Sequence, residues 1–160
     1  MGKLSGNGPL FCAVCLICYA VPLRGQALHV SSVSARPGEK FTLEISIDLP
    51  AGLKVATLKW TLLFPAQLVD PEQGRPEARE AAKSAGKSLT CVQPKPYAYS
   101  CILTGGLTTL TTGRIAVFPL RVRADAHTGT TNLRITDVDA ADTDLRTVKF
   151  GTTDGSLTIR

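Results

Sequence analysis

Four aspartates lie close together near the end of the chain, and their spacing is the first feature that suggests chemistry. They are Asp137, Asp139, Asp142 and Asp144. Calcium takes about six to eight oxygen ligands from a compact loop, and four carboxylates could supply most of them. The segment lacks the central glycine and the distal glutamate of an EF-hand loop. Acidic turns are commonly just solvated, so a solvated turn is the preferred interpretation, with a calcium site as the alternative.

The same carboxylates do not predict catalysis. Glycoside hydrolysis needs two carboxyl groups that face each other across a cleft, one of them with a raised pKa. Four carboxylates on one exposed segment provide neither the separation nor the desolvation. His127 is most simply a turn residue before Thr128 and Gly129, and no serine or cysteine forms a nucleophile motif with it. We therefore expect a protein that is not an enzyme and that has no cofactor apart from the calcium alternative.

The first 27 residues have the pattern of a secretory signal peptide. Lys3 gives a basic start, residues 9–21 form an apolar run, and Gly25 and Ala27 are small residues placed for cleavage after Ala27. The run is shorter than the roughly 20 apolar residues of a membrane span. An uncleaved anchor over residues 10–23 stays open as the alternative. We expect a mature domain at 28–160 without a membrane span, in a secreted, periplasmic or cell-surface protein.

Cleavage of the signal peptide would remove three of the five cysteines from the mature chain. The remaining two are Cys91 and Cys101. Two cysteines in an exported chain predict one disulfide, and free buried thiols are the alternative. The two cysteines flank residues 94–96, Pro-Lys-Pro, which suits neighbouring strands joined by a tight connection. A zinc site is not expected, because His29 and His127 lie far apart and show no paired ligand spacing.

The charge of the chain does not indicate a nucleic-acid partner. The full sequence has 18 basic and 13 acidic residues, and removal of Lys3 and Arg24 leaves 16 against 13, a formal charge of +3. The excess is scattered and lacks the basic clusters with interleaved aromatic residues that such partners require. The threonine-rich segment 105–113 has no lysine and no following helix, so it does not predict a phosphate loop.

Hydrophobic residues alternate with polar ones along most of the chain, which indicates amphipathic β-strands. Residues 41–49 show this most clearly. We expect strands at 28–33, 41–49, 55–64, 89–92, 97–103, 114–122, 130–138, 145–150 and 156–159. About nine short strands separated by turn signals predict an all-β, antiparallel, jelly-roll-like sandwich. Residues 74–86 predict a short surface helix or mobile loop whose only apolar side chains are alanines, and which therefore docks weakly.

Three stretches resemble the cohesin domain, within the superfamily that also holds cellulose-binding sandwiches. Residues 33–43 are similar to its opening strands and their Pro-Gly-acidic turn, and residues 60–69 to its corner after a hydrophobic strand. The third stretch, 113–159, resembles the closing strands up to the final Gly-Ser-Leu-Thr-Ile. Residues 74–86 and the cysteine pair depart from the family pattern. The resemblance implies a cohesin-like sandwich over the whole mature chain.

That resemblance implies a non-catalytic binding module with a dockerin-like or other extracellular protein partner, in a setting linked to polysaccharide degradation. A carbohydrate-binding module and a structural part of an envelope or secretion assembly, paired through an edge strand, are the alternatives. Tyr97 and Tyr99 share a strand face by spacing and could stack on sugar, whereas Trp60 belongs to a core face. The expected binding-surface residues are Tyr97, Tyr99 and Leu107.

Overall fold

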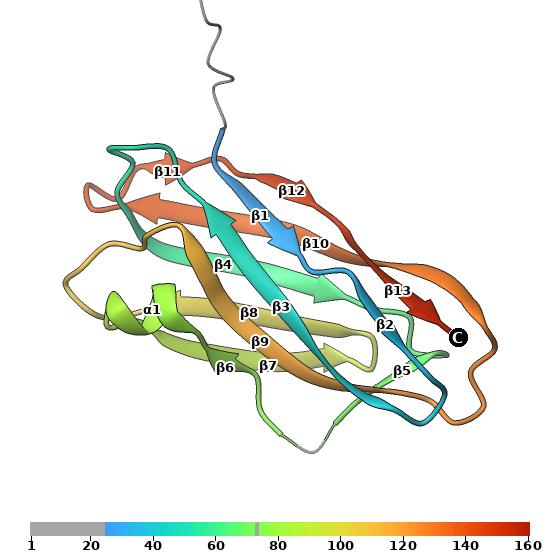
Figure 1. Cartoon of the computed structure of the whole chain (residues 1–160). Coiled ribbons are helices and arrows are strands. Elements are labelled where there is room, and N and C mark those ends of the chain that lie inside the picture. Colours follow the sequence, from blue (N-terminus) through green and yellow to red (C-terminus); the bar gives the residue numbers. More distant parts are fainter. Residues whose placement is uncertain (1–24, 73) are drawn as a thin grey trace, which may run out of the picture.

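The computed structural model describes residues 25–72 and 74–160, and most of the predicted signal peptide lies outside these residues. Two β-sheets pack face to face in a sandwich, which confirms the predicted fold class (Figure 1). The first strand, β1, begins at Ala27, and the N–H of Gly151 donates to the carbonyl oxygen of Gln26. The fold therefore includes two residues that precede the expected start at residue 28. Cleavage after Ala27 stays a prediction.

The first sheet contains both early and late strands of the chain. Its path is β12 (Gly151–Thr153), β1 (Ala27–Val30), β3 (Lys40–Asp48), β9 (Gly113–Val122) and β5 (Val69–Pro71), with β6 (Glu77–Ala78) also paired with β9. All of these pairings are antiparallel except that of β1 with β12. The long β3–β9 pair forms the centre of this sheet.

The second sheet is built on three adjacent long strands. Its path is β2 (Val33–Ala35), β13 (Gly155–Ile159), β10 (Gly129–Asp142), β4 (Val55–Leu63), β8 (Ala98–Thr104) and β7 (Ser88–Lys95), with β11 (Thr147–Val148) also paired with β10. Only β2 and β13 are parallel. Each sheet thus contains one parallel pair of strands, which the predicted antiparallel arrangement did not include.

The core lies between the sheets and follows the predicted alternation. Along β3, Leu43, Ile45 and Ile47 are fully buried, and Trp60 of β4 and Phe118 of β9 are the largest fully buried side chains. Trp60 is therefore a core residue, as its spacing predicts. Its indole N–H has no hydrogen-bond partner among the described residues. A buried donor without a partner costs about 1–3 kcal/mol, so the packing of this ring offsets a local penalty.

The alanine-rich segment forms a short helix, α1 (Glu80–Ser84), which lies against β9. Ala81 and Ala82 are buried in the core, and a Cβ placed on Gly113 would lie 3.4 Å from the Cβ of Ala81. The predicted helix is present, with its alanines packed into the core, and weak docking stays a prediction. Small side chains on both sides let the helix come close to the strand. In the part of the chain that the structure describes, no helix is long and apolar enough to cross a membrane.

Candidate binding face

The outer face of the first sheet is crossed by ion pairs. Arg114 of β9 contacts two carboxylates, Glu44 of β3 at 3.0 Å and Glu80 of α1 at 3.1 Å. Arg121 lies 2.8 Å from the carboxylate of Glu72, and Lys40 also reaches that carboxylate. The hydrogen bond to Glu44, together with the charge of Glu80, raises the pKa of Arg114, and these two contacts connect side chains from β3, β9 and α1. Most of the charged groups on this face are thus occupied by one another.

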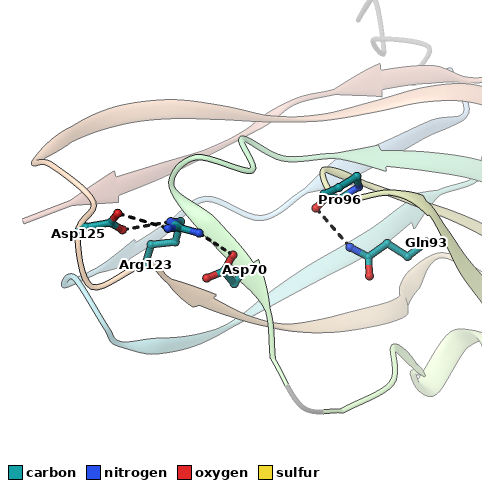
Figure 2. Close-up of polar contacts among 5 residues, drawn as sticks. All are labelled: Asp70, Gln93, Pro96, Arg123 and Asp125. Atoms are coloured by element: carbon teal, nitrogen blue, oxygen red, sulfur yellow. Dashed lines mark hydrogen bonds and ion pairs between the residues drawn. The ribbon is translucent and has the colours of Figure 1, made fainter.

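Further ion pairs continue this pattern at the end of β9. Figure 2 shows Arg123 between Asp70 of β5 and Asp125, with nitrogen–oxygen distances of 3.4 Å and 3.1 Å. The hydrogen bond from the Arg123 guanidinium is the main cause that lowers the pKa of the Asp125 carboxyl. Both acids are exposed or half-buried, so these contacts orient the loop more than they stabilise the fold.

The outer face of the second sheet has a different composition. Period two turns Trp60, Tyr99 and Ile135 inward, so the residues between them point outward. Lys59 and Asp139 are paired in register at its centre, yet among the described residues neither forms an ion pair within 4 Å. The β4–β8–β10 face includes Thr57, Lys59, Thr61, Leu63, Ser100, Ile102, Arg134, Thr136, Asp139 and Ala141. Hydroxyls and small apolar groups dominate it.

Two shallow hollows lie at opposite ends of the β4–β8–β10 face. The first is lined by Thr61, Leu63, Lys95, Tyr97, Ser100 and Thr136. The second is lined by Thr57, Lys59, Ile102, Asp139, Ala141 and Thr147. Side chains of a partner can enter a surface with such hollows, and loss of water from hydroxyls and methyl groups costs less than loss of water from paired charges. This face can therefore form a protein contact with little reorganisation.

The structure separates the two tyrosines that the sequence placed on one face. Tyr97 lies in the turn between β7 and β8, is 41% exposed, and has the Lys95 ammonium 5.6 Å from its ring centre. Tyr99 is only 8% exposed and packs against Phe64 and Phe118, and burial raises the pKa of its hydroxyl. The expectation of an exposed Tyr97–Tyr99 pair is wrong, because Tyr97 belongs to a turn and not to the strand. A two-ring sugar platform does not form.

Leu107 lies on the crossover from β8 in the second sheet to β9 in the first. It is fully exposed, while Leu110 of the same segment is buried and its N–H donates to the carbonyl of Val55. The buried Lys87 donates from Nζ to the carbonyl of Gly105 at 2.6 Å and holds the start of the crossover. Val55 begins β4, whereas Phe64, just beyond the end of β4, donates to the carbonyl of Tyr97. Leu107 and Tyr97 therefore lie at opposite ends of the sandwich.

The four aspartates do not converge on one point. Asp137 lies in the irregular part of β10 with a φ of 51°, and Asp139 points outward beside Lys59. The carboxylate of Asp142 accepts hydrogen bonds from the N–H groups of Asp144 and Arg146, and therefore closes the turn after β10. Among the described residues, no group of three or more potential ligands could hold a metal ion. The geometry therefore does not support calcium at these residues.

Cys91 and Cys101 form the predicted disulfide. They are directly opposite each other in β7 and β8, so the bond crosses neighbouring strands as their spacing suggested. The alternative of two free thiols is wrong. Beside the disulfide, the side-chain amide of Gln93 donates to the carbonyl of Pro96 at 3.3 Å (Figure 2). Both contacts hold the β7–β8 hairpin, which forms one side of the β4–β8–β10 face.

Sequence reasoning missed this face, although a signal for it was present. The outward positions of β4 and β8 are mostly hydroxyl or apolar residues, with Lys59 as the charged one. Those of β3 and β9 combine hydroxyl residues such as Thr42 and Ser46 with charged residues such as Glu44 and Arg114. Both kinds of residue fit the outward positions of a period-two pattern, so the lower share of charged residues in β4 and β8 was the available sign that the two faces differ.

Comparison with known proteins shows similarity in structure but not in sequence. No protein-family profile matches the chain, and no curated protein matches its sequence. A cohesin from scaffoldin B of Acetivibrio cellulolyticus, solved with a Cel5 dockerin variant, superposes with a TM-score of 0.76 at 14% identity, over 85% of this chain and 99% of that one. A cohesin of OlpA from Clostridium thermocellum, solved with a dockerin, gives 0.74 at 15% identity over 84% and 99%. A non-cellulosomal cohesin from Archaeoglobus fulgidus gives 0.72 at 16% identity over 84% and 91%.

Proposed function

Because the chain has the cohesin fold, we propose that it is a non-catalytic module that binds a dockerin-like protein through the β4–β8–β10 face. The contrast between the outer faces of the two sheets carries this proposal. One face has its charges neutralised by neighbours, whereas the other offers hydroxyls, methyl groups and two hollows to a partner. Charged residues are depleted in the buried part of protein interfaces, so a partner would have to match the opposite charges of Lys59 and Asp139 at the centre of this face.

Ile102 and Tyr97 are the expected anchors of this contact. Ile102 is 38% exposed near the middle of β8, and Tyr97 is 41% exposed beside the first hollow. Large side chains that a partner can fully cover contribute most of the free energy of binding at protein interfaces. Lys59 and Asp139 would then select the partner by charge rather than supply affinity.

Export of the protein and a link to polysaccharide degradation belong to the same proposal. The disulfide supports export, because such bonds persist in oxidising compartments. The solved cohesin–dockerin complexes that the chain resembles support a dockerin-like partner. We place the protein outside the cytoplasm, where its partner would be another exported protein.

The test compares one substitution on each face. Residues 25–160 are immobilised as wild type, Thr61→Arg and Thr42→Arg, and exported proteins of the source cells are passed over each, with calcium or with a chelator. Thr61 lines the first hollow, whereas Thr42 is an exposed residue on the other sheet. We expect a partner that wild type and Thr42→Arg retain and that Thr61→Arg loses by at least about tenfold, since a buried unpaired charge is costly. Equal retention by all three proteins would contradict the proposed face.

A further inference from the structure

Six strands of the described fold pair with one neighbour only, and five of these are short. β12, β5 and β2 have three residues each and β6 and β11 have two, whereas β7 has eight. From Ser88 to Gln93, β7 contains no charged residue and no proline. Proteins usually shorten, charge or cover an edge, because a long uncharged edge is a template for another strand. Within the described fold, residues 88–93 are the longest stretch of edge without a charge or a proline, and Pro94, Lys95 and an irregular register follow them in β7.

The cysteine pair reveals which main-chain groups of β7 face outward. The Cα atoms of Cys91 and Cys101 are 4.1 Å apart and directly opposite. In antiparallel sheets, opposed residues are about 4.5 Å apart where they do not exchange hydrogen bonds, and about 5.5 Å apart where they do. Thr90 and Val92 therefore bond to β8, while the N–H and C=O groups of Leu89 and Cys91 point away from it.

A neighbouring contact agrees with this assignment of outward-facing groups. Lys87 lies two residues before Leu89, so its main-chain groups also point away from β8, and its N–H donates to the carbonyl of Ala82 in α1. The helix thus covers the edge at residue 87. Within residues 25–72 and 74–160, the main-chain groups of Leu89 and Cys91 form no hydrogen bond outside the β7–β8 ladder, and the phase of that ladder turns them away from β8. Four donors and acceptors in a row are therefore available to an added strand.

A hollow lies beside these groups on the core side of the edge. It is lined by Gly74, Arg75, Pro76, Leu89, Thr90, Cys91, Gln93 and Tyr99. Leu89 and Tyr99 supply apolar surface on the side of β7 and β8, and Pro76 supplies it on the other side. Arg75 is exposed and forms no ion pair with any described residue. The hollow thus combines apolar surface from Leu89, Tyr99 and Pro76 with polar side chains, and the exposed cation of Arg75 lies beside it.

We propose that the β7 edge binds an extended peptide segment of another protein as an added strand. The main-chain groups of Leu89 and Cys91 would bond to the peptide backbone. Side chains alternate along a strand, so one apolar side chain of the peptide would enter the hollow. An aspartate or glutamate of the peptide would lie near Arg75. This site is separate from the β4–β8–β10 face and does not depend on the proposed function.

A second copy of this chain fits the edge less well than a peptide does. In a dimer, two β7 strands could pair edge to edge around a two-fold axis perpendicular to the sheet. The faces of the two strands that point to the core would then lie on the same face of the joined sheet. Each copy would then bring its own segment 74–76 into the space beneath the shared strands. A single peptide strand brings no such segment. We therefore assign the edge to a peptide.

The experiment uses a library of linear random peptides and the full chain held in detergent. The best binder is synthesised and titrated into wild type, Leu89→Pro, Leu89→Ala and Arg75→Glu. Proline at residue 89 removes only an outward N–H, since the β7–β8 ladder uses Thr90 and Val92. The alanine variant controls for the lost side chain. Retention of the disulfide and of the near-ultraviolet signal of Trp60 checks that each variant is folded.

We expect binders with alternating apolar residues and at least one acid. Leu89→Pro should weaken binding about tenfold beyond Leu89→Ala, since one net hydrogen bond is lost. Arg75→Glu is a surface change that should fold in any case, and it should weaken acidic binders by a similar factor. Failure to select any binder, or binding that neither Leu89→Pro nor Arg75→Glu affects, overturns the proposal. A wild-type dimer that Leu89→Pro dissociates overturns the peptide in favour of a second copy.

Discussion

The two outer faces of this sandwich solve the same problem of solubility in different ways. On the first sheet, Arg114 and Arg121 tie carboxylates from neighbouring elements into surface ion pairs. On the second, Thr61 and Ser100 present hydroxyls, and a disulfide holds the outermost strands. Paired charges already have partners within the molecule, so they resist removal from water. The comparison shows that the two faces differ in how many of their charged side chains already have partners within the molecule.

The largest expected effect comes from the core that both faces share. Trp60→Ala should lower the free energy of unfolding by about 3–5 kcal/mol, because a fully buried large ring leaves a cavity. Chemical denaturation measures this loss. Trp60→Phe is the control, since it keeps most of the volume and removes the N–H that has no partner. If Trp60→Phe is as harmful as Trp60→Ala, cavity formation is not the dominant cost.

The disulfide should matter next, and mainly on the second sheet. The double substitution Cys91→Ser and Cys101→Ser should lower stability by about 3 kcal/mol in the chain-entropy treatment of a short loop. Hydrogen exchange should become faster in β7 and β8 but change less in β3 and β9. An equal increase in hydrogen-exchange rate in both sheets would show that the disulfide stabilises the whole fold and not the second sheet alone.

A smaller effect is expected from the ion pairs of the first sheet. Arg114→Ala should lower the midpoint of thermal unfolding slightly, since its contacts with Glu44 and Glu80 are exposed to solvent. Salt should reduce the difference from wild type. Partner binding should stay unchanged. Loss of partner binding in this variant would remove the functional distinction between the faces.

The smallest effect concerns pH. The pKa of Asp125 is lowered by its hydrogen bond with Arg123, so the folded state favours the ionised carboxyl. Its contribution to stability is present above the ordinary pKa, near 3.8, and is lost as the pH falls through the lowered value. Thermal unfolding followed from neutral pH to acid should show a slight extra loss in wild type. Asp125→Asn should lack that part of the loss, and identical acid profiles would assign it to other carboxyls such as Glu80.

Local patterns determined much of this protein. Period two in residues 41–49 set an amphipathic strand, because opposite faces of a strand meet opposite environments. The same reasoning placed Trp60 in the core, and the two cysteines that remain after the signal peptide predicted the disulfide between Cys91 and Cys101. The order of strands and turns also indicated the cohesin fold, which the structural similarities confirm at the level of the fold.

Only the tertiary structure decided which polar residues matter. Tyr97 and Tyr99 have the spacing of one strand face, but a turn at Tyr97 and an irregularity between Val92 and Lys95 separate them. The alanines of α1 became core residues because β9 offers Gly113 opposite them. The four aspartates diverged along β10 and its turn. Each outcome depends on contacts with a segment that is distant in the sequence. A local sequence pattern contains no information about which segment that will be.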